Sequence, residues 1–193
     1  MKQSLGANTL VGATTVWVIG TYDRNGRPNF MTAAWGGVCC SDPPCIGVSL
    51  RKATYSYSGI VERKAFTVNI PSAKYVKETD YAGIASGRDV DKWQATGLTL
   101  EKSERVDAPY VVEFPLVLEC RLFQTLELGL HTHFVGEIVD VKAEESVLGE
   151  DRTIDIEKVD PFFYIPGKRS YYRIGPYLGK AHSIGAGLRK KHI

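Results

Sequence analysis

The feature of this sequence that most constrains its fold is a pair of long apolar runs, Leu116–Leu128 and His131–Ala143, separated only by Gly129 and Leu130. Long apolar runs with a two-residue connection that contains glycine are typical of an antiparallel hairpin, because glycine accepts the backbone angles of a tight turn. We therefore expect the second half of the chain to be built on two long paired strands. A short strand over Phe162–Ile165 should follow them.

The first half of the sequence predicts a second hairpin. Residues Thr14–Tyr22 are rich in β-branched and aromatic side chains, which favour strands. The segment Asp23–Pro28 interrupts them and contains Asn25-Gly26, a strong short-range signal for a tight turn. Residues Asn29–Gly36 should then return antiparallel to the first strand.

Few helices are expected between the two hairpins. The spacing of Tyr57, Ile60 and Val61 predicts a helix over Thr54–Lys64 with Thr54 as its N-cap. The other expected elements are a turn at Ser41–Pro44, strands over Cys45–Arg51 and Ala65–Ile70, and a helix from Ser72 to about Ile84. Short strands with two or three helices favour a mainly β fold, an antiparallel β-barrel with α-helical insertions, over an alternating βαβ fold.

Length and composition exclude several classes of protein. The chain has 193 residues, which suits one domain over residues 1–193, with a core at about 12–179 and a C-terminal tail at 180–193. The formal charge of +2 is too balanced for a nucleic-acid-binding protein, and the basic end Arg189–His192 suits a solvated tail. No secretory signal and no apolar run of membrane-spanning length are visible, so we expect a cytoplasmic protein without membrane or nucleic-acid partners.

The segment Ser49–Tyr55 combines a hydroxyl group, two cations and the expected start of a helix. On a strand, Ser49 and Arg51 point to the same face, and Lys52 adds a second positive charge. Unpaired N–H groups at a helix N-terminus favour an anion such as a phosphate monoester. Residue types alone slightly favour a solvated basic turn with an ordinary helix cap over such a site.

The segment Asn29–Gly37 gathers small residues beside an aromatic side chain. Residues such as Ala33 and Ala34, next to Trp35, allow a backbone to lie flat against a planar ring and to donate hydrogen bonds to it. A flavin requires such donors, because they tune the electronics of its ring. Taken alone, a hairpin strand whose small residues pack under Trp35 explains the same pattern better.

Four segments, taken in order, resemble the successive signatures of the flavin-reductase-like, flavoredoxin-type family of FMN-binding proteins. They are Asn29–Trp35, Cys39–Pro44, Ser49–Tyr55 and Phe66–Ile70, and the similarity extends from about residue 12 to residue 179. The resemblance implies a split β-barrel of Greek-key type that binds FMN non-covalently. It also implies a homodimer with the flavin near the subunit interface.

The resemblance further implies which residues surround the cofactor. Those expected to contact the isoalloxazine ring and ribityl chain are Thr32, Ala33, Ala34 and Trp35. Those expected around the ribityl phosphate are Ser49, Arg51, Lys52, Ala53, Thr54 and Tyr55. Asn69 would hydrogen-bond the ribityl chain or its supporting loop, or else close a turn before Pro71. Lys92 would reach the flavin or its phosphate.

Histidine and cysteine residues do not predict a metal site. His131 and His133 share one face of an expected strand, but no third ligand is apparent near them in the sequence. The resemblance places His131 near a nicotinamide pocket, where it would donate a hydrogen bond to substrate or reduced flavin. The spacing of the four cysteines, Cys39, Cys40, Cys45 and Cys120, is not that of a redox dithiol or a zinc site, so we expect reduced thiols. The roles of Cys39 and Cys40 stay open.

The activity implied by the resemblance is that of an FMN-dependent oxidoreductase. NADH or NADPH would give a hydride to the flavin, which would pass electrons to a small-molecule or protein acceptor. The alternative is a flavoredoxin-like electron carrier that exchanges electrons with a protein partner and has no nicotinamide site of its own. A third class, a ligand-binding barrel that has lost its flavin, is disfavoured by the intact cluster of Ser49, Arg51, Lys52 and Thr54.

Overall fold

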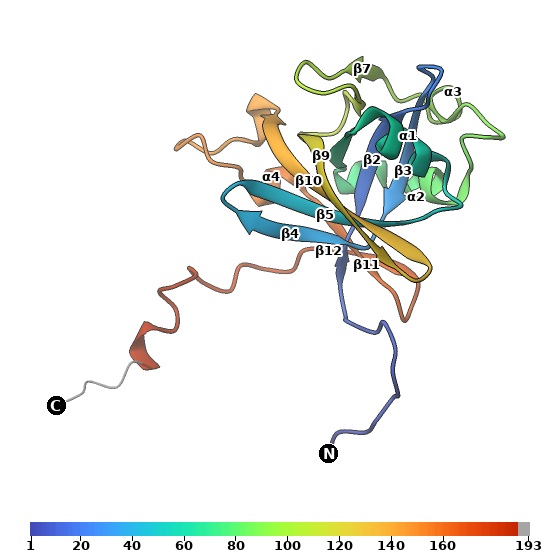
Figure 1. The fold of residues 1–193 in the computed structure, drawn as a ribbon. Helices are drawn as coiled ribbons and strands as arrows, with labels where there is room; N and C mark the ends of the chain where they lie inside the picture. Colours follow the sequence, from blue (N-terminus) through green and yellow to red (C-terminus); the bar gives the residue numbers. More distant parts are fainter. Residues whose placement is uncertain (189–193) are drawn as a thin grey trace.

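The structure, a computed structural model, describes residues 1–188, so the basic segment Arg189–His192 expected as a solvated tail lies outside the described residues. In Figure 1 the segment before β1 and the segment from β12 to residue 188 run away from the body of the fold. The strands are β1 (Thr14–Thr15), β2 (Trp17–Tyr22), β3 (Pro28–Ala33), β4 (Gly36–Ser41), β5 (Pro44–Arg51), β6 (Ala65–Ile70), β7 (Leu100–Lys102), β8 (Pro109–Val111), β9 (Leu116–Leu128), β10 (His131–Ala143), β11 (Phe162–Ile165) and β12 (Ser170–Arg173). The helices are α1 (Tyr55–Arg63), α2 (Val76–Ile84), α3 (Lys92–Thr96) and α4 (Ile156–Val159), with 3₁₀ turns η1 (Ala73–Tyr75), η2 (Glu145–Val147) and η3 (Ala186–Leu188).

A seven-stranded antiparallel sheet forms the body of the protein, with the strand order β3-β2-β6-β9-β10-β5-β4. The sheet curls, so that β3 at one end also contacts β5 near the other end. Helices α1 and α2 are insertions that pack on the β2–β3 region (Figure 1). The predicted mainly β fold with α-helical insertions is confirmed.

The long hairpin predicted from the apolar runs is present with the predicted bounds. Strands β9 and β10 pair from His131 opposite Leu128 to Ala143 opposite Leu116. Gly129 takes a φ of +56° in the connecting turn, a left-handed conformation that glycine adopts at little cost. This hairpin places His131 at the turn end of β10.

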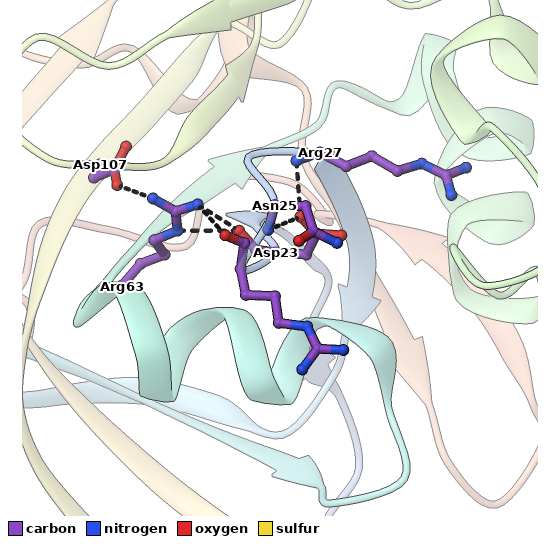
Figure 2. Close-up of polar contacts among 6 residues, drawn as sticks. Asp23, Asn25, Arg27, Arg63 and Asp107 are labelled. Carbon is purple, nitrogen blue, oxygen red and sulfur yellow. Dashed lines mark hydrogen bonds and ion pairs between the residues drawn. The ribbon is translucent and has the colours of Figure 1, made fainter.

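The first hairpin, β2–β3, is also confirmed, and side chains hold its turn. Asp23 Oδ1 accepts hydrogen bonds from the N–H groups of Asn25 and Arg27, both at 2.8 Å (Figure 2). Arg63, in the last turn of α1, donates to the carbonyl oxygen of Asp23 through Nε at 3.0 Å and Nη2 at 2.7 Å, and to Asp107 through Nη1 at 3.0 Å. The turn is therefore fixed to α1, whose other end lies at the candidate site.

Two expected strands are shorter than the sequence predicts. The strand expected over Thr14–Tyr22 breaks at Val16, because Thr14 and Thr15 pair with β11 whereas Trp17 onward pairs with β3. The strand expected to continue to Gly36 ends at Ala33. The carbonyl oxygen of Trp35 accepts a 2.8 Å hydrogen bond from the N–H of Ser49, which turns the chain from β3 into β4. Residues 34 and 35 thus form a connection beside the end of β5.

Apolar side chains on both sides of the sheet form the core. One cluster, which includes Ile19, Val48, Phe66 and Phe134, fills the barrel, and Ile60 of α1 belongs to it. A smaller cluster around Phe30 packs under α2 and α3. No helix within residues 1–188 is long and apolar enough to cross a membrane.

The C-terminal part contains a sheet that the sequence did not predict in full. Strand β11 was expected, but β12 was not, and together with β1 they form a separate three-stranded sheet. Strands β7 and β8 and the short helices α3 and α4 were also missed. These elements are only three to five residues long, too short to show a periodic apolar pattern.

Candidate functional site

A large cavity of about 420 Å³ lies where the turn after β3, the ends of β5 and β10, α2 and the β11–β12 hairpin meet. Its volume falls in the range of about 300–1,000 Å³ that is usual for ligand pockets. Eight of the predicted site residues line it: Thr32, Ala33, Ala34, Trp35, Ser49, Arg51, Thr54 and His131. The sequence segments 29–37 and 49–55, which are separate in the chain, therefore meet in space as expected.

A small cavity of about 240 Å³ adjoins the large one. The two are neighbours because Met31, Thr54, Gly83 and Ile84 line both. Three more of the predicted residues line the small cavity: Ala53, Tyr55 and Lys92. The two cavities together form an elongated site, and the structure brings eleven of the thirteen predicted residues to it.

The start of α1 forms one wall of the small cavity. Thr54 is the N-cap residue, as predicted, but its side chain makes no capping hydrogen bond. Its hydroxyl instead donates to the carbonyl oxygen of Arg51 at 2.8 Å. The N–H of Tyr57 donates to the carbonyl oxygen of Thr54 at 3.3 Å, whereas those of Tyr55 and Ser56 have no side-chain cap and are left for an anion in the cavity.

Two cations lie at the small cavity, and its described lining residues include no acidic side chain. Arg88 Nη1 donates to the carbonyl oxygen of Ala53 at 2.8 Å, which holds the guanidinium at the start of α1. Lys92 is only 3% exposed, and its Nζ donates to the carbonyl oxygens of Phe30 at 2.9 Å and Ala82 at 2.8 Å. Burial lowers the pKa of Lys92 to about 8, since a charged group is less stable away from water.

A histidine on the paired strand holds the side chain of Ser49. In the β5–β10 register, Ser49 lies opposite His133, and Arg51 lies opposite His131. Ser49 Oγ and His133 Nδ1 are 2.8 Å apart and share a hydrogen bond. His133 Nε2 in turn lies 4.0 Å from the Sγ atom of Cys39. His131 lines the large cavity, while His133 supports Ser49 from the side.

Two predicted residues do not lie at either cavity. Lys52 follows the end of β5, and its Nζ pairs with Glu127 Oε2 at 2.6 Å, with more than half of each side chain exposed. Asn69 is fully buried inside the fold. Its Nδ2 donates to the carbonyl oxygen of Val18 at 2.9 Å, and its Oδ1 accepts from the N–H of Val111 at 2.9 Å. Asn69 therefore joins β2, β6 and β8, and it neither lines a cavity nor closes a turn.

The structure adds lining residues that sequence reasoning missed. In the large cavity these are Val16, Met31, Leu50, Asp80, Gly83, Ile84, Tyr164, Arg169 and Tyr171. Tyr171 donates a 2.7 Å hydrogen bond to Asp80, and burial together with this bond raises the pKa of the phenol. In the small cavity, Ser86, Gly87 and Arg88 were missed, because nothing in their spacing separates them from an ordinary loop.

The cysteines are free, as expected: all four lie within residues 1–188 and none is in a disulfide. Within the same residues, no group of three or more histidine, cysteine, aspartate or glutamate side chains is arranged to hold a metal ion.

Comparison with known proteins identifies close relatives of the chain. A family model for the flavin reductase like domain matches residues 12–173. The solved structure of flavoredoxin from Desulfovibrio vulgaris (Miyazaki F) is 55% identical, with a TM-score of 0.92 over 96% of this chain and 100% of that one. A flavoredoxin structure from Methanosarcina acetivorans is 34% identical, with a TM-score of 0.92 over 97% and 99% of the two chains.

A third structure, from Shewanella frigidimarina, is described as a flavin reductase with a split barrel domain. It is 26% identical, with a TM-score of 0.80 over 90% of this chain and 87% of that one. The matches to the first two curated relatives span less than two thirds of their length. An uncharacterised protein of Archaeoglobus fulgidus is 37% identical over 60% of this chain and 65% of its own length. An uncharacterised protein of Pyrococcus abyssi is 30% identical over 58% of this chain and 63% of its own length.

Proposed function

Because the chain belongs to the family of flavin reductase like domains, we propose that it binds FMN across the two adjoining cavities and transfers electrons through it. The observation that carries this proposal is the junction of a cavity walled by small and aromatic residues with a cavity that contains two cations and no carboxylate. FMN has two parts of the same kind, a planar ring and a phosphate monoester joined by a flexible chain.

The small cavity fits the phosphate. Arg88 can donate charge-assisted hydrogen bonds, Lys92 adds a second positive charge, and the uncapped first turn of α1 adds backbone N–H groups. The phosphate contacts therefore come from Arg88 and the start of α1, together with Lys92. Ser49, Arg51 and Lys52 were also expected among these contacts. Ser49 and Arg51 instead line the large cavity, and the ammonium group of Lys52 is already paired with Glu127.

The large cavity fits the ring. Ala33 and Ala34 present little more than backbone at the end of β3, and Trp35 and Tyr164 supply aromatic walls. Ser49 and His131 add polar groups on the sheet side. A cavity with mostly apolar walls and a few placed polar groups is the usual form of a cofactor pocket.

When bound, FMN supplies the redox chemistry, because it can accept electrons from one partner and deliver them to another. The residues of this chain bind and orient it and control access to it. His133 holds Ser49 Oγ at the cavity wall, and His131, which lines the same cavity, would donate a hydrogen bond toward the ring. The β11–β12 hairpin, held to α2 by the Tyr171–Asp80 hydrogen bond, lines one side of the cavity.

We propose that the electron donor is NADH or NADPH, which makes the protein a flavin reductase. The large cavity supports this, since it combines Arg51 and His131 with the apolar walls that would receive a nicotinamide ring. The second candidate is an electron carrier that exchanges electrons with another protein and has no nicotinamide site. The 55% identity to a flavoredoxin over nearly the whole chain supports this candidate.

The test is anaerobic mixing of the FMN-loaded protein with NADH and with NADPH in a stopped-flow instrument. Fast loss of flavin absorbance with either donor supports the reductase. No loss with both donors, while dithionite still reduces the bound flavin, supports the carrier. Purified protein that is colourless and takes up no added FMN would contradict both candidates.

We further propose that the chain forms a homodimer, as the family resemblance implies. The β9–β10 hairpin exposes the apolar side chains of Phe123, Leu126, Leu128 and Leu130, each more than half accessible to solvent. Exposed apolar side chains gathered on one element favour association with a partner. Light scattering coupled to gel filtration should give twice the mass of one chain, whereas a single-chain mass would contradict this proposal.

A further inference from the structure

Two arginine side chains line the large cavity from different parts of the fold. Arg51 is the last residue of β5 in the seven-stranded sheet, and Arg169 lies in the turn between β11 and β12 of the three-stranded sheet. The chain segments that carry them are more than one hundred residues apart. The fold therefore places two guanidinium groups at one cavity from two separate sheets.

Neither guanidinium group is neutralised by the chain itself. Across residues 1–188, the structure records no ion pair and no side-chain hydrogen bond from Arg51 or Arg169. Both are exposed residues, and within the same residues Arg24, Arg27, Arg105 and Arg152 likewise make no such contact, so it is the shared cavity that sets Arg51 and Arg169 apart. Among the described lining residues of the large cavity, the one carboxylate is Asp80, which already accepts the hydrogen bond of Tyr171. The cavity thus has an excess of positive charge, which attracts anions.

The backbone at Arg169 is held in an unfavourable conformation. Its φ is +51°, in the left-handed region, which costs a residue with a Cβ roughly 1 kcal/mol compared with glycine. Its N–H donates to the carbonyl oxygen of Ile165 at 2.8 Å, which fixes the turn. The turn thereby fixes the position from which the Arg169 side chain extends.

The phosphate of FMN does not need these two arginines. The small cavity has its own cations, Arg88 and Lys92, and the uncapped start of α1. Neither Arg51 nor Arg169 lines that cavity. With the phosphate held there, the two arginine charges at the large cavity exceed the single carboxylate that lines it, Asp80.

We propose that Arg51 and Arg169 form an anion subsite for a second, small ligand of the large cavity, one that carries a phosphate, diphosphate or carboxylate group. This inference rests on the proposed binding of FMN. It narrows the reaction partner of the flavin to an anionic small molecule. Guanidinium groups bind phosphate and carboxylate oxygens alike through paired N–H donors. An experiment must therefore decide which of these groups the ligand carries.

The experiment is calorimetric titration of the FMN-loaded protein with inorganic pyrophosphate and, separately, with malonate. We expect at least one anion to bind at low ionic strength and its affinity to fall as salt is added. Tighter binding of pyrophosphate would indicate a ligand with a diphosphate group, and tighter binding of malonate would indicate a ligand with a carboxylate group. Arg51→Gln and Arg169→Gln should each weaken binding severalfold, and the double variant should weaken it more than tenfold.

The control variant is Arg121→Gln, which removes an exposed arginine that pairs with Glu137 on the paired strand β10. It should bind the anion as the wild type does. Wild-type protein that binds neither anion, or a double variant that binds as well as the wild type, would overturn the subsite. Loss of FMN itself from the Arg51→Gln variant would also overturn it, because Arg51 would then be a phosphate ligand.

FMN content is read separately from the flavin absorbance of each sample. A protein that takes up no FMN therefore contradicts the proposed function. FMN-loaded protein that binds no anion contradicts the subsite alone.

Discussion

The hydroxyl of Tyr171 donates a 2.7 Å hydrogen bond to Oδ1 of Asp80, and both residues line the large cavity. The bond joins β12 to α2, two elements that no backbone pairing connects. Tyr171 also packs edge-on against Phe162, with ring centroids 5.4 Å apart and an interplanar angle of 90°. The side of the cavity formed by the β11–β12 hairpin is thereby fixed to α2.

Removing this bond should speed the release of FMN. Tyr171→Phe keeps the ring but loses a hydrogen bond to a carboxylate, which contributes about 1.5 kcal/mol. We expect FMN to dissociate roughly tenfold faster, measured by displacement of bound FMN in a stopped-flow instrument. The control is Tyr172→Phe, on the half-exposed neighbour. Equal dissociation rates in the wild type and Tyr171→Phe would show that the hairpin does not retain the cofactor.

Arg88 should decide the preference for FMN over riboflavin. Arg88→Ala removes charge-assisted hydrogen bonds from the small cavity, and such bonds contribute about 1.5–3 kcal/mol. FMN affinity should therefore fall by roughly 10- to 100-fold, while riboflavin affinity changes little, as measured by quenching of flavin fluorescence. Lys52→Ala is the control, because Lys52 is an exposed cation outside both cavities. An equal loss of FMN and riboflavin affinity in Arg88→Ala would place the phosphate elsewhere.

Lys92 should make FMN binding depend on pH. Burial lowers its pKa to about 8, so the side chain is charged below that pH and neutral above it. The phosphate is already a dianion there, since its second pKa is about 6. FMN affinity should therefore fall, by roughly tenfold, as the pH rises from about 7 to about 9. Riboflavin affinity should stay flat over the same range.

The matched variant for this prediction is Lys92→Met, which keeps a long apolar stem without the charge. It should bind FMN more weakly than the wild type at about pH 7 and should lose the pH dependence. Riboflavin binding checks that the variant still folds. A wild-type FMN affinity that is constant across this range would mean that Lys92 does not interact with the phosphate.

Gly87 should be needed for the shape of the small cavity. A Cβ atom added to Gly87 would lie 2.2 Å from Oδ1 of Asn29 and 2.7 Å from Cδ1 of Tyr55. Both neighbours line the same cavity, so Gly87→Ala must displace the loop or its partners, at a cost of about 1–3 kcal/mol. We expect FMN affinity to drop at least roughly tenfold. Gly37→Ala, where a Cβ meets nothing within 4 Å, should leave it unchanged.

The parts of the fold that could be predicted are those with long, regular patterns. The β9–β10 hairpin has a continuous apolar pattern and a glycine in its turn, so its bounds follow directly from the residues. The second strand of the β11–β12 hairpin has only four residues, and none of them is fully buried, so it shows no apolar face. Its place over the cavity depends on tertiary packing, which local patterns do not encode.

The residues of the candidate site also fall into two groups, those located by a local sequence pattern and those located only by the tertiary fold. Ser49 and Arg51 line the same cavity, as strand alternation predicts, but they were expected at the phosphate and do not line the small cavity. Lys52 was misplaced because its partner, Glu127, lies 75 residues away on β9. Asn69 was misplaced because β8, which supplies one of its hydrogen-bond partners, was not predicted. Arg88 and Arg169 were missed, since their segments show no periodicity and reach the cavities only through the tertiary fold.

The most direct test of the account is a titration of flavin-free protein into FMN, followed by the flavin fluorescence and compared with the same titration into riboflavin. We expect saturable quenching at one FMN per chain, with FMN bound more tightly than riboflavin because of the cations at the small cavity. Fluorescence that does not change on addition of the protein, or equal affinity for the two flavins, would contradict it.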